Sequence, residues 1–163
     1  MKKRIIALGL LWCLSAVMLQ AARVDTVLVR SAAMNKDVKV VYVLPDKAIG
    51  KQACPVVYLL HGYGGNARSW VQLKPELPQM ADEKGIIFVC PDGKNSWYWD
   101  SPENPAYRYE TFVTSELVKY TDGNYATIPD RKARAISGLS MGGHGALWSA
   151  IRHKDVFGAA GSM

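Results

Sequence analysis

The residues best suited to chemistry lie in the segment Ile136-Ser137-Gly138-Leu139-Ser140-Met141-Gly142-Gly143. This segment fits G-x-S-x-G, a pattern in which the serine is a nucleophile on a sharp turn from a strand to a helix. Such a turn has no room for side chains two residues before and two residues after the serine, so both positions are glycine. The alternative is a glycine-rich turn that happens to contain a serine. We predict that Ser140 is a catalytic nucleophile.

The flanking residues support this prediction. Residues 133–137 form a short apolar run that is suited to a buried strand. Residues 143–153 place apolar side chains on one face of a helix, namely Ala146, Leu147, Ala150 and Ile151.

A serine nucleophile needs two N–H donors that stabilise the oxyanion of the tetrahedral intermediate. In α/β-hydrolases one donor is the residue after the nucleophile, which here is Met141. The other comes from a loop after an earlier strand, which here is His61-Gly62-Tyr63-Gly64-Gly65. We favour the backbone N–H of Tyr63, and Gly64 is the alternative.

The general base is harder to place. In α/β-hydrolases the order along the chain is nucleophile, acid and histidine, and after Ser140 this chain offers only His144, His153 and Asp155. Neither histidine follows a further strand that could carry it over Ser140. We therefore expect His61 to brace its loop, His144 to pack on its helix, and His153 to place charge at a helix end.

The remaining chain predicts an α/β fold. Residues 24–30 and 38–44 are suited to an antiparallel hairpin, and residues 45–52 to a polar loop. Residues 55–60 and 85–90 are nearly continuous apolar runs, as in a parallel sheet that is covered on both faces. Helices are expected at 67–83, broken by Pro75 and Pro78, and at 109–120. This alternation predicts an α/β-hydrolase three-layer sandwich with a mostly parallel sheet and an N-terminal antiparallel hairpin.

Residues 156–163 read as the start of a further buried strand. We therefore expect the chain to be truncated after the nucleophile helix, with residues 23–163 the N-terminal portion of an incomplete domain. The acid and histidine of the triad are expected downstream of Met163.

Aromatic residues are concentrated in the non-periodic stretch 94–108. Trp97, Tyr98 and Trp99 could line a pocket for an acyl group or a sugar, with Trp97 and Trp99 the favoured contacts, or the loop could simply pack its own aromatic side chains. Asp100 and Glu110 are expected to hydrogen-bond the loop and the start of the following helix rather than to be catalytic. Asp92 is expected to be a structural turn residue.

The N-terminus predicts a signal peptide over residues 1–22 and an exported protein. Lys2, Lys3 and Arg4 precede the apolar run 5–19, and the small residues Ala21 and Ala22 lie near a cut site. The run is short for a membrane span, so no stable span is expected after cleavage; an uncleaved anchor is the alternative. We expect a periplasmic or extracellular location.

Composition excludes some classes of partner and cofactor. The 163 residues are 49% hydrophobic and carry a formal net charge of +6. Without residues 1–22 the balance falls to 17 basic against 14 acidic residues, with no basic stripe, so nothing favours nucleic-acid binding. The mature part has two cysteines, Cys54 and Cys90, expected as free buried thiols at opposite ends of neighbouring strands. No metal site or organic cofactor is expected, and the oligomeric state stays open.

Five segments, in this order, resemble the esterase D group of esterases: 61–65, 91–93, 100–102, 110–112 and 138–147. That group includes S-formylglutathione hydrolases, feruloyl and acetyl esterases, short-chain ester hydrolases and mycolyltransferases. The resemblance covers residues 38–163. It implies an α/β-hydrolase without metal or organic cofactor, with Ser140 as nucleophile and Met141 and Tyr63 as oxyanion donors. It assigns no acid or histidine, because no position here matches them.

We therefore expect an exported serine esterase that forms a Ser140 acyl-enzyme. Its expected substrates are acetyl, feruloyl or other acyl esters of carbohydrate, or small short-chain esters. Alternatives are an acyltransferase of the same fold, an S-formylglutathione hydrolase-like thioesterase, and a non-catalytic binding module.

Overall fold

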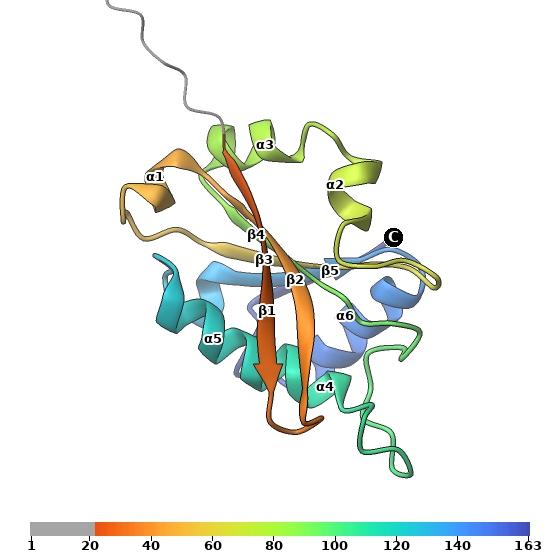
Figure 1. Ribbon diagram of the computed structural model, residues 1–163. Helices are drawn as coiled ribbons and strands as arrows, with labels where there is room; N and C mark the ends of the chain where they lie inside the picture. The colour runs from red at the N-terminus through yellow and green to blue at the C-terminus, as the bar shows by residue number, and fades with distance from the viewer. Residues whose placement is uncertain (1–21) are drawn as a thin grey trace, which may run out of the picture.

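The computed structural model of the protein describes residues 22–163 (Figure 1). The predicted signal peptide, residues 1–22, lies outside the described residues except for Ala22. Among residues 22–163, no helix is long and apolar enough to cross a membrane.

The first two strands form the predicted antiparallel hairpin. β1 (Arg23–Ser31) pairs with β2 (Lys36–Leu44) along its whole length, and the turn between them contains Asn35 at φ 50°. β2 alternates sides, because Val40 and Tyr42 face one core while Val41 and Val43 face the other. The hairpin therefore belongs to the main sheet, since β2 also pairs antiparallel with β4 (Ile87–Pro91).

The centre of the sheet is parallel. Its strand order is β1-β2-β4-β3-β5-β6, with parallel pairing of β4 with β3 (Val56–Leu60), β3 with β5 (Arg134–Gly138) and β5 with β6 (Ala159–Ser162). The carboxyl ends of β3, β4 and β5 thus share one edge of the sheet, where ligands bind in open α/β sheets. The predicted mostly parallel sheet is confirmed.

Helices cover both faces of the sheet, as expected for three layers (Figure 1). α2 (Ser69–Leu73) and α3 (Leu77–Lys84) lie on one face, where Leu77 and Ala81 are buried in one core. α3 ends at Gly85, whose left-handed φ of 62° terminates the helix. The break predicted at Pro75 and Pro78 is confirmed, because Pro75 separates the two helices and Pro78 lies in the first turn of α3.

The other face carries one long helical segment and the nucleophile helix. The segment comprises α4 (Tyr109–Thr111), a π-helical turn η1 (Phe112–Glu116) and α5 (Leu117–Asn124). It packs against the sheet together with α6 (Met141–Arg152), through a larger core that includes Phe112, Leu117, Met141 and Ala146. A 3₁₀ turn, η2 (Arg131–Ala133), precedes β5.

One prediction on local structure was wrong. The polar loop at 45–52 contains a short helix, α1 (Asp46–Ile49), because the backbone N–H groups of Ala48 and Ile49 bond to the Pro45 carbonyl. The strand expected after α6 is present as β6, which pairs with β5 at the edge of the described sheet.

The cysteines behave as predicted. Cys54 and Cys90 are free and buried, one before β3 and the other near the end of β4. Burial raises the pKa of the Cys90 thiol to about 12, so this thiol is inert at neutral pH.

Candidate active site

Ser140 stands on a sharp turn between β5 and α6 and is exposed to solvent. Its backbone has φ 54° and ψ −114°, a conformation that L-residues other than glycine seldom adopt. Strain of this kind persists only where the surrounding structure imposes it. The backbone of Ser140 is held on both sides, since its N–H donates to the Met163 carbonyl at 2.7 Å and its own carbonyl accepts from His144 N–H at 3.0 Å.

The two glycines that flank Ser140 are required by direct backbone contact. A Cβ atom on Gly138 would lie 2.3 Å from the carbonyl carbon of Gly142. A Cβ atom on Gly142 would lie 2.2 Å from the Leu60 carbonyl oxygen at the end of β3. The steric explanation for G-x-S-x-G therefore holds here: the helix begins so close to β3 and β5 that neither position can carry a side chain.

The loop 61–65 follows β3 and lies beside Ser140. A Cβ atom on Gly62 would lie 3.3 Å from the Leu139 carbonyl oxygen and 3.7 Å from the Ser140 Cβ. The Gly64 N–H donates to Asn95 Oδ1 at 2.8 Å, and the Gly65 N–H donates to the Gly62 carbonyl at 3.0 Å. Among residues 22–163, no group accepts a hydrogen bond from the N–H of Tyr63 or of Met141. Of the two candidate donors in this loop, Tyr63 thus has its N–H unoccupied and Gly64 does not.

His61 braces this loop, as the sequence suggested. Its Nδ1 lies 2.7 Å from the Gly62 carbonyl oxygen, and its Nε2 accepts a hydrogen bond from the Gly93 N–H at 2.9 Å. Because Nε2 accepts, Nδ1 is the nitrogen that donates to the Gly62 carbonyl oxygen. Both ring nitrogens are occupied, so His61 is a structural residue.

Tyr98 belongs to the aromatic run that the sequence suggested as a pocket wall, but its side chain is buried. Its hydroxyl accepts from the His61 N–H at 3.0 Å and donates to the His61 carbonyl at 3.3 Å. The ring is fully buried, and a Cβ atom on either Gly93 or Gly145 would clash with it. Tyr98 therefore fixes the end of β3 from the aromatic stretch 94–108. In the sequence, Tyr98 is one of three consecutive aromatic residues, and nothing in that run indicates which side chain is buried.

Neither His144 in α6 nor His153 just after it is hydrogen-bonded to the Ser140 side chain. His144 Nδ1 lies 3.2 Å from the Trp97 carbonyl oxygen, and its ring stacks on Trp148 with 6.0 Å between ring centroids. His153 Nε2 lies 2.8 Å from Glu110 Oε1. Within residues 22–163, no side chain is hydrogen-bonded to Ser140 Oγ. His144 packs on its helix as predicted, whereas His153 is also a partner of Glu110.

Three acidic side chains have structural roles, as expected. Asp100 accepts from the Thr111 N–H at 3.0 Å and from the Thr111 hydroxyl at 2.5 Å, so it caps the start of the helical segment. Asp92 accepts from the Lys94 N–H within its turn. Glu110 is described below. No group of three His, Cys, Asp or Glu side chains in the described part of the chain could hold a metal ion.

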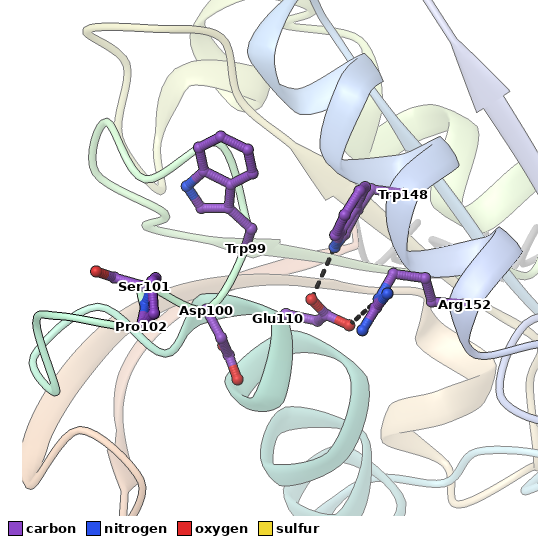
Figure 2. A pocket seen from close by; sticks show the side chains of 7 residues that line it. All are labelled: Trp99, Asp100, Ser101, Pro102, Glu110, Trp148 and Arg152. Atoms are coloured by element: carbon purple, nitrogen blue, oxygen red, sulfur yellow. Dashed lines mark hydrogen bonds and ion pairs between the residues drawn. The ribbon is translucent and has the colours of Figure 1, made fainter.

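Trp97 and Trp99 both meet the His144 ring edge to face and remain 42% and 47% exposed. Trp99 also lines a cavity of about 400 Å³ between the 94–108 stretch, α4 and α6 (Figure 2). The other residues that line it are Asp100, Ser101, Pro102, Glu110, Trp148 and Arg152. Neither Ser140 nor Trp97 lines this cavity. Of the two tryptophans that the sequence suggested for one pocket, only Trp99 therefore lines it.

Comparison with known proteins identifies the family. The model of the esterase family, described as "Putative esterase", matches residues 31–163. The chain belongs to this esterase family. Its segments that resembled esterase D proteins lie within the matched region.

Several members of known sequence are similar to this esterase-family chain. An acetyl esterase of Caldicellulosiruptor saccharolyticus is 28% identical over 135 residues, which cover 78% of this chain and 50% of the relative. A diacylglycerol acyltransferase/mycolyltransferase, Ag85A of Mycobacterium gordonae, is 33% identical over 150 residues, with coverage of 86% and 42%.

Solved structures agree with the fold. A ferulic acid esterase has a TM-score of 0.73 at 31% identity, with coverage of 85% of this chain and 58% of that one. An S-formylglutathione hydrolase from Agrobacterium tumefaciens has a TM-score of 0.77 at 26% identity, with coverage of 88% and 60%. The chain spans about half the length of the curated relatives that it matches.

Proposed function

We propose that the full-length protein is an exported serine carboxylic-ester hydrolase that acts through an acyl-enzyme on Ser140. The observation that carries this proposal is the strained, exposed Ser140 on a turn whose flanking glycines touch backbone. A serine held in this way has an accessible hydroxyl and a fixed direction of attack. The segment 1–22 supports export.

The chemistry follows from the geometry around Ser140. A general base takes the Oγ proton as Oγ attacks the ester carbonyl carbon, and the oxyanion that forms accepts hydrogen bonds from the N–H groups of Met141 and Tyr63. The base passes that proton to the alcohol as the ester C–O bond breaks. Water then attacks the acyl-enzyme, one water proton returns to Ser140 Oγ through the base, and the carboxylic acid is released. The general base and its acid come from the part of the full-length protein that corresponds to the rest of its relatives' length.

The proposed substrates are acetyl, feruloyl or other acyl esters of carbohydrate, or small short-chain esters. The similar proteins named as an acetyl esterase and a ferulic acid esterase support acyl groups of these two kinds. Trp97 and Trp99 offer exposed aromatic surface against the His144 ring of α6, which suits either an aromatic acyl group or a sugar.

Two related reactions compete with hydrolysis. The similarity to a mycolyltransferase favours acyl transfer, in which a sugar or lipid hydroxyl replaces water in the second step. The similarity to an S-formylglutathione hydrolase favours a thioester substrate. Product analysis with an added alcohol acceptor, and a comparison of oxygen esters with thioesters, separate these reactions.

The test is labelling of the full-length protein with a fluorophosphonate probe, with the labelled residue mapped by mass spectrometry. Turnover of p-nitrophenyl acetate and methyl ferulate is measured beside Ser140→Ala. We expect the label on Ser140, and a loss of kcat of about 10⁴-fold or more in the variant. A folded full-length protein that takes no label and shows no turnover would overturn the proposal and favour a binding module.

A further inference from the structure

From the cavity beside Trp99 we infer a subsite for a sugar residue of the alcohol part of the substrate, about two helical turns from Ser140. This inference rests on the proposed function, because it extends the substrate from that site. The proposed subsite is the cavity shown in Figure 2, and Ser140 is not among the residues that line it.

The lining of the cavity suits a sugar ring. Trp99 and Trp148 meet edge to face with 6.3 Å between their ring centroids, so they present apolar ring surface from two directions. Sugars offer an apolar ring face beside hydroxyl groups, and aromatic side chains bind such faces. The volume of about 400 Å³ falls in the range of small-ligand sites.

Hydrogen bonds to Glu110 hold Trp148 and Arg152 on the polar side of the cavity. Glu110, 7% exposed, accepts from Trp148 Nε1 at 2.7 Å and from Arg152 Nε at 2.8 Å (Figure 2). Arg152 also lies over the Trp148 ring, 4.9 Å from its centroid. Within residues 22–163 the two terminal nitrogens of Arg152 have no hydrogen-bond partner, so they can donate to hydroxyl or carboxylate oxygens of a sugar.

The cavity and Ser140 lie along the same face of α6. His144, Trp148 and Arg152 follow Ser140 at successive steps of four residues along α6, and His144 stacks on Trp148. Eight residues of α-helix separate Ser140 from Trp148, which corresponds to roughly 12 Å along the helix axis. A small ester cannot reach both points, whereas an ester of an oligosaccharide can.

The experiment compares two substrates of the full-length protein: p-nitrophenyl acetate, which has no sugar, and an acetylated xylo-oligosaccharide. The variants are Trp99→Ala and Arg152→Ala. The control is Arg30→Ala, which removes an arginine of similar exposure on the β1–β2 hairpin. We expect each cavity variant to raise KM for the oligosaccharide about tenfold more than for p-nitrophenyl acetate, and the control to change both substrates alike.

A second measurement does not depend on turnover. Calorimetric titration of the deacetylated xylo-oligosaccharide into full-length Ser140→Ala protein should show binding that Trp99→Ala weakens about tenfold. If turnover and Ser140 labelling persist but neither KM nor binding responds to the cavity variants, the subsite is wrong and the esterase stands. If the sugar binds in the cavity but Ser140 takes no label, the proposed esterase fails and the sugar site remains.

Discussion

Asn95 lies outside the motifs that identify the site, yet it decides which N–H groups of the 61–65 loop remain available. Its side-chain oxygen occupies the Gly64 N–H at 2.8 Å, while the neighbouring Tyr63 N–H stays unoccupied. An oxyanion donor must point at the reacting oxygen before the reaction begins, because reorganisation during the reaction would cost part of its benefit. Under the proposed mechanism we therefore expect Asn95 to act as a positioning residue, through the backbone of the loop.

We predict that Asn95→Ala lowers kcat of the full-length protein about tenfold with little change in KM, because only the oxyanion is destabilised. The measurement is steady-state turnover of p-nitrophenyl acetate, with the melting temperature followed in parallel. The matched control is Asn124→Ala, which removes an exposed asparagine bonded to the Tyr120 carbonyl at the end of α5. A rise in KM alone, or the same effect from Asn124→Ala, would contradict the positioning role.

At the scale of elements, the nucleophile turn depends on how closely α6 approaches β3 and β5. Gly142 touches the end of β3 through the Leu60 carbonyl, and Gly138 touches Gly142. β6 adds a second restraint, because Met163 N–H donates to the Gly138 carbonyl and the Met163 carbonyl accepts from Ser140 N–H. Three strands and one helix thus hold a single strained residue.

We predict that Gly142→Ala destabilises the protein by about 2 kcal/mol or more and removes Ser140 labelling, because the added methyl group must push α6 away from Leu60. Gly123→Ala is the matched control, since a Cβ atom there meets nothing within 4 Å. In the helical position of Gly123 the same change should stabilise by about 0.5 kcal/mol, because alanine loses less backbone entropy. Denaturant unfolding of the full-length variants tests both expectations. Equal stability of the two variants would show that the close approach is not required.

At the scale of the whole molecule, Glu110 joins parts of the chain that are far apart in sequence. It lies at the start of the helical segment, and it accepts from Trp148, Arg152 and His153 at the far end of α6. Burial raises the pKa of Glu110, but the hydrogen bonds from these three side chains outweigh that effect and hold the pKa below its ordinary value. The ionised form is therefore the one that stabilises the fold.

The contribution of Glu110 to stability therefore depends on pH. A carboxylate with a lowered pKa stabilises the protein above its ordinary pKa of about 4.3, and this contribution is lost as the pH falls through the pKa of the folded state. We predict that Glu110→Gln lowers the free energy of unfolding at pH 7 by about 2 kcal/mol, and that the difference from the unmodified protein shrinks below about pH 4.

Urea unfolding of the full-length protein between pH 3.5 and pH 7 measures this difference. Glu76→Gln serves as the control, since it breaks an exposed pair with Lys74, and surface pairs contribute little. A Glu110→Gln effect no larger than that of the control, or one that does not vary with pH, would rule out the linkage.

Much of the architecture was predictable from local pattern alone. Apolar runs on both faces of a strand report burial in a parallel sheet, so 55–60 and 85–90 were correctly assigned. The turn at Ser140 was predictable because glycine at the second position before and after the serine is the only residue that these close backbone contacts allow. The 45–52 helix was missed, because it is a single turn closed by backbone hydrogen bonds.

The sequence by itself determined the position of the strand-to-helix turn that carries Ser140, the loop beside it, and the order of strands and helices along the chain, because short-range spacing of glycine and apolar residues marks each of these. Only the tertiary structure decided which of Tyr63 and Gly64 keeps an unoccupied N–H, that Tyr98 turns inward while Trp97 and Trp99 stay exposed, and that Glu110 meets the end of α6. These outcomes depend on contacts between residues 31 to 43 positions apart, such as Gly64 with Asn95 and Glu110 with His153. Such contacts are set by packing across the sheet, for which local sequence carries no signal.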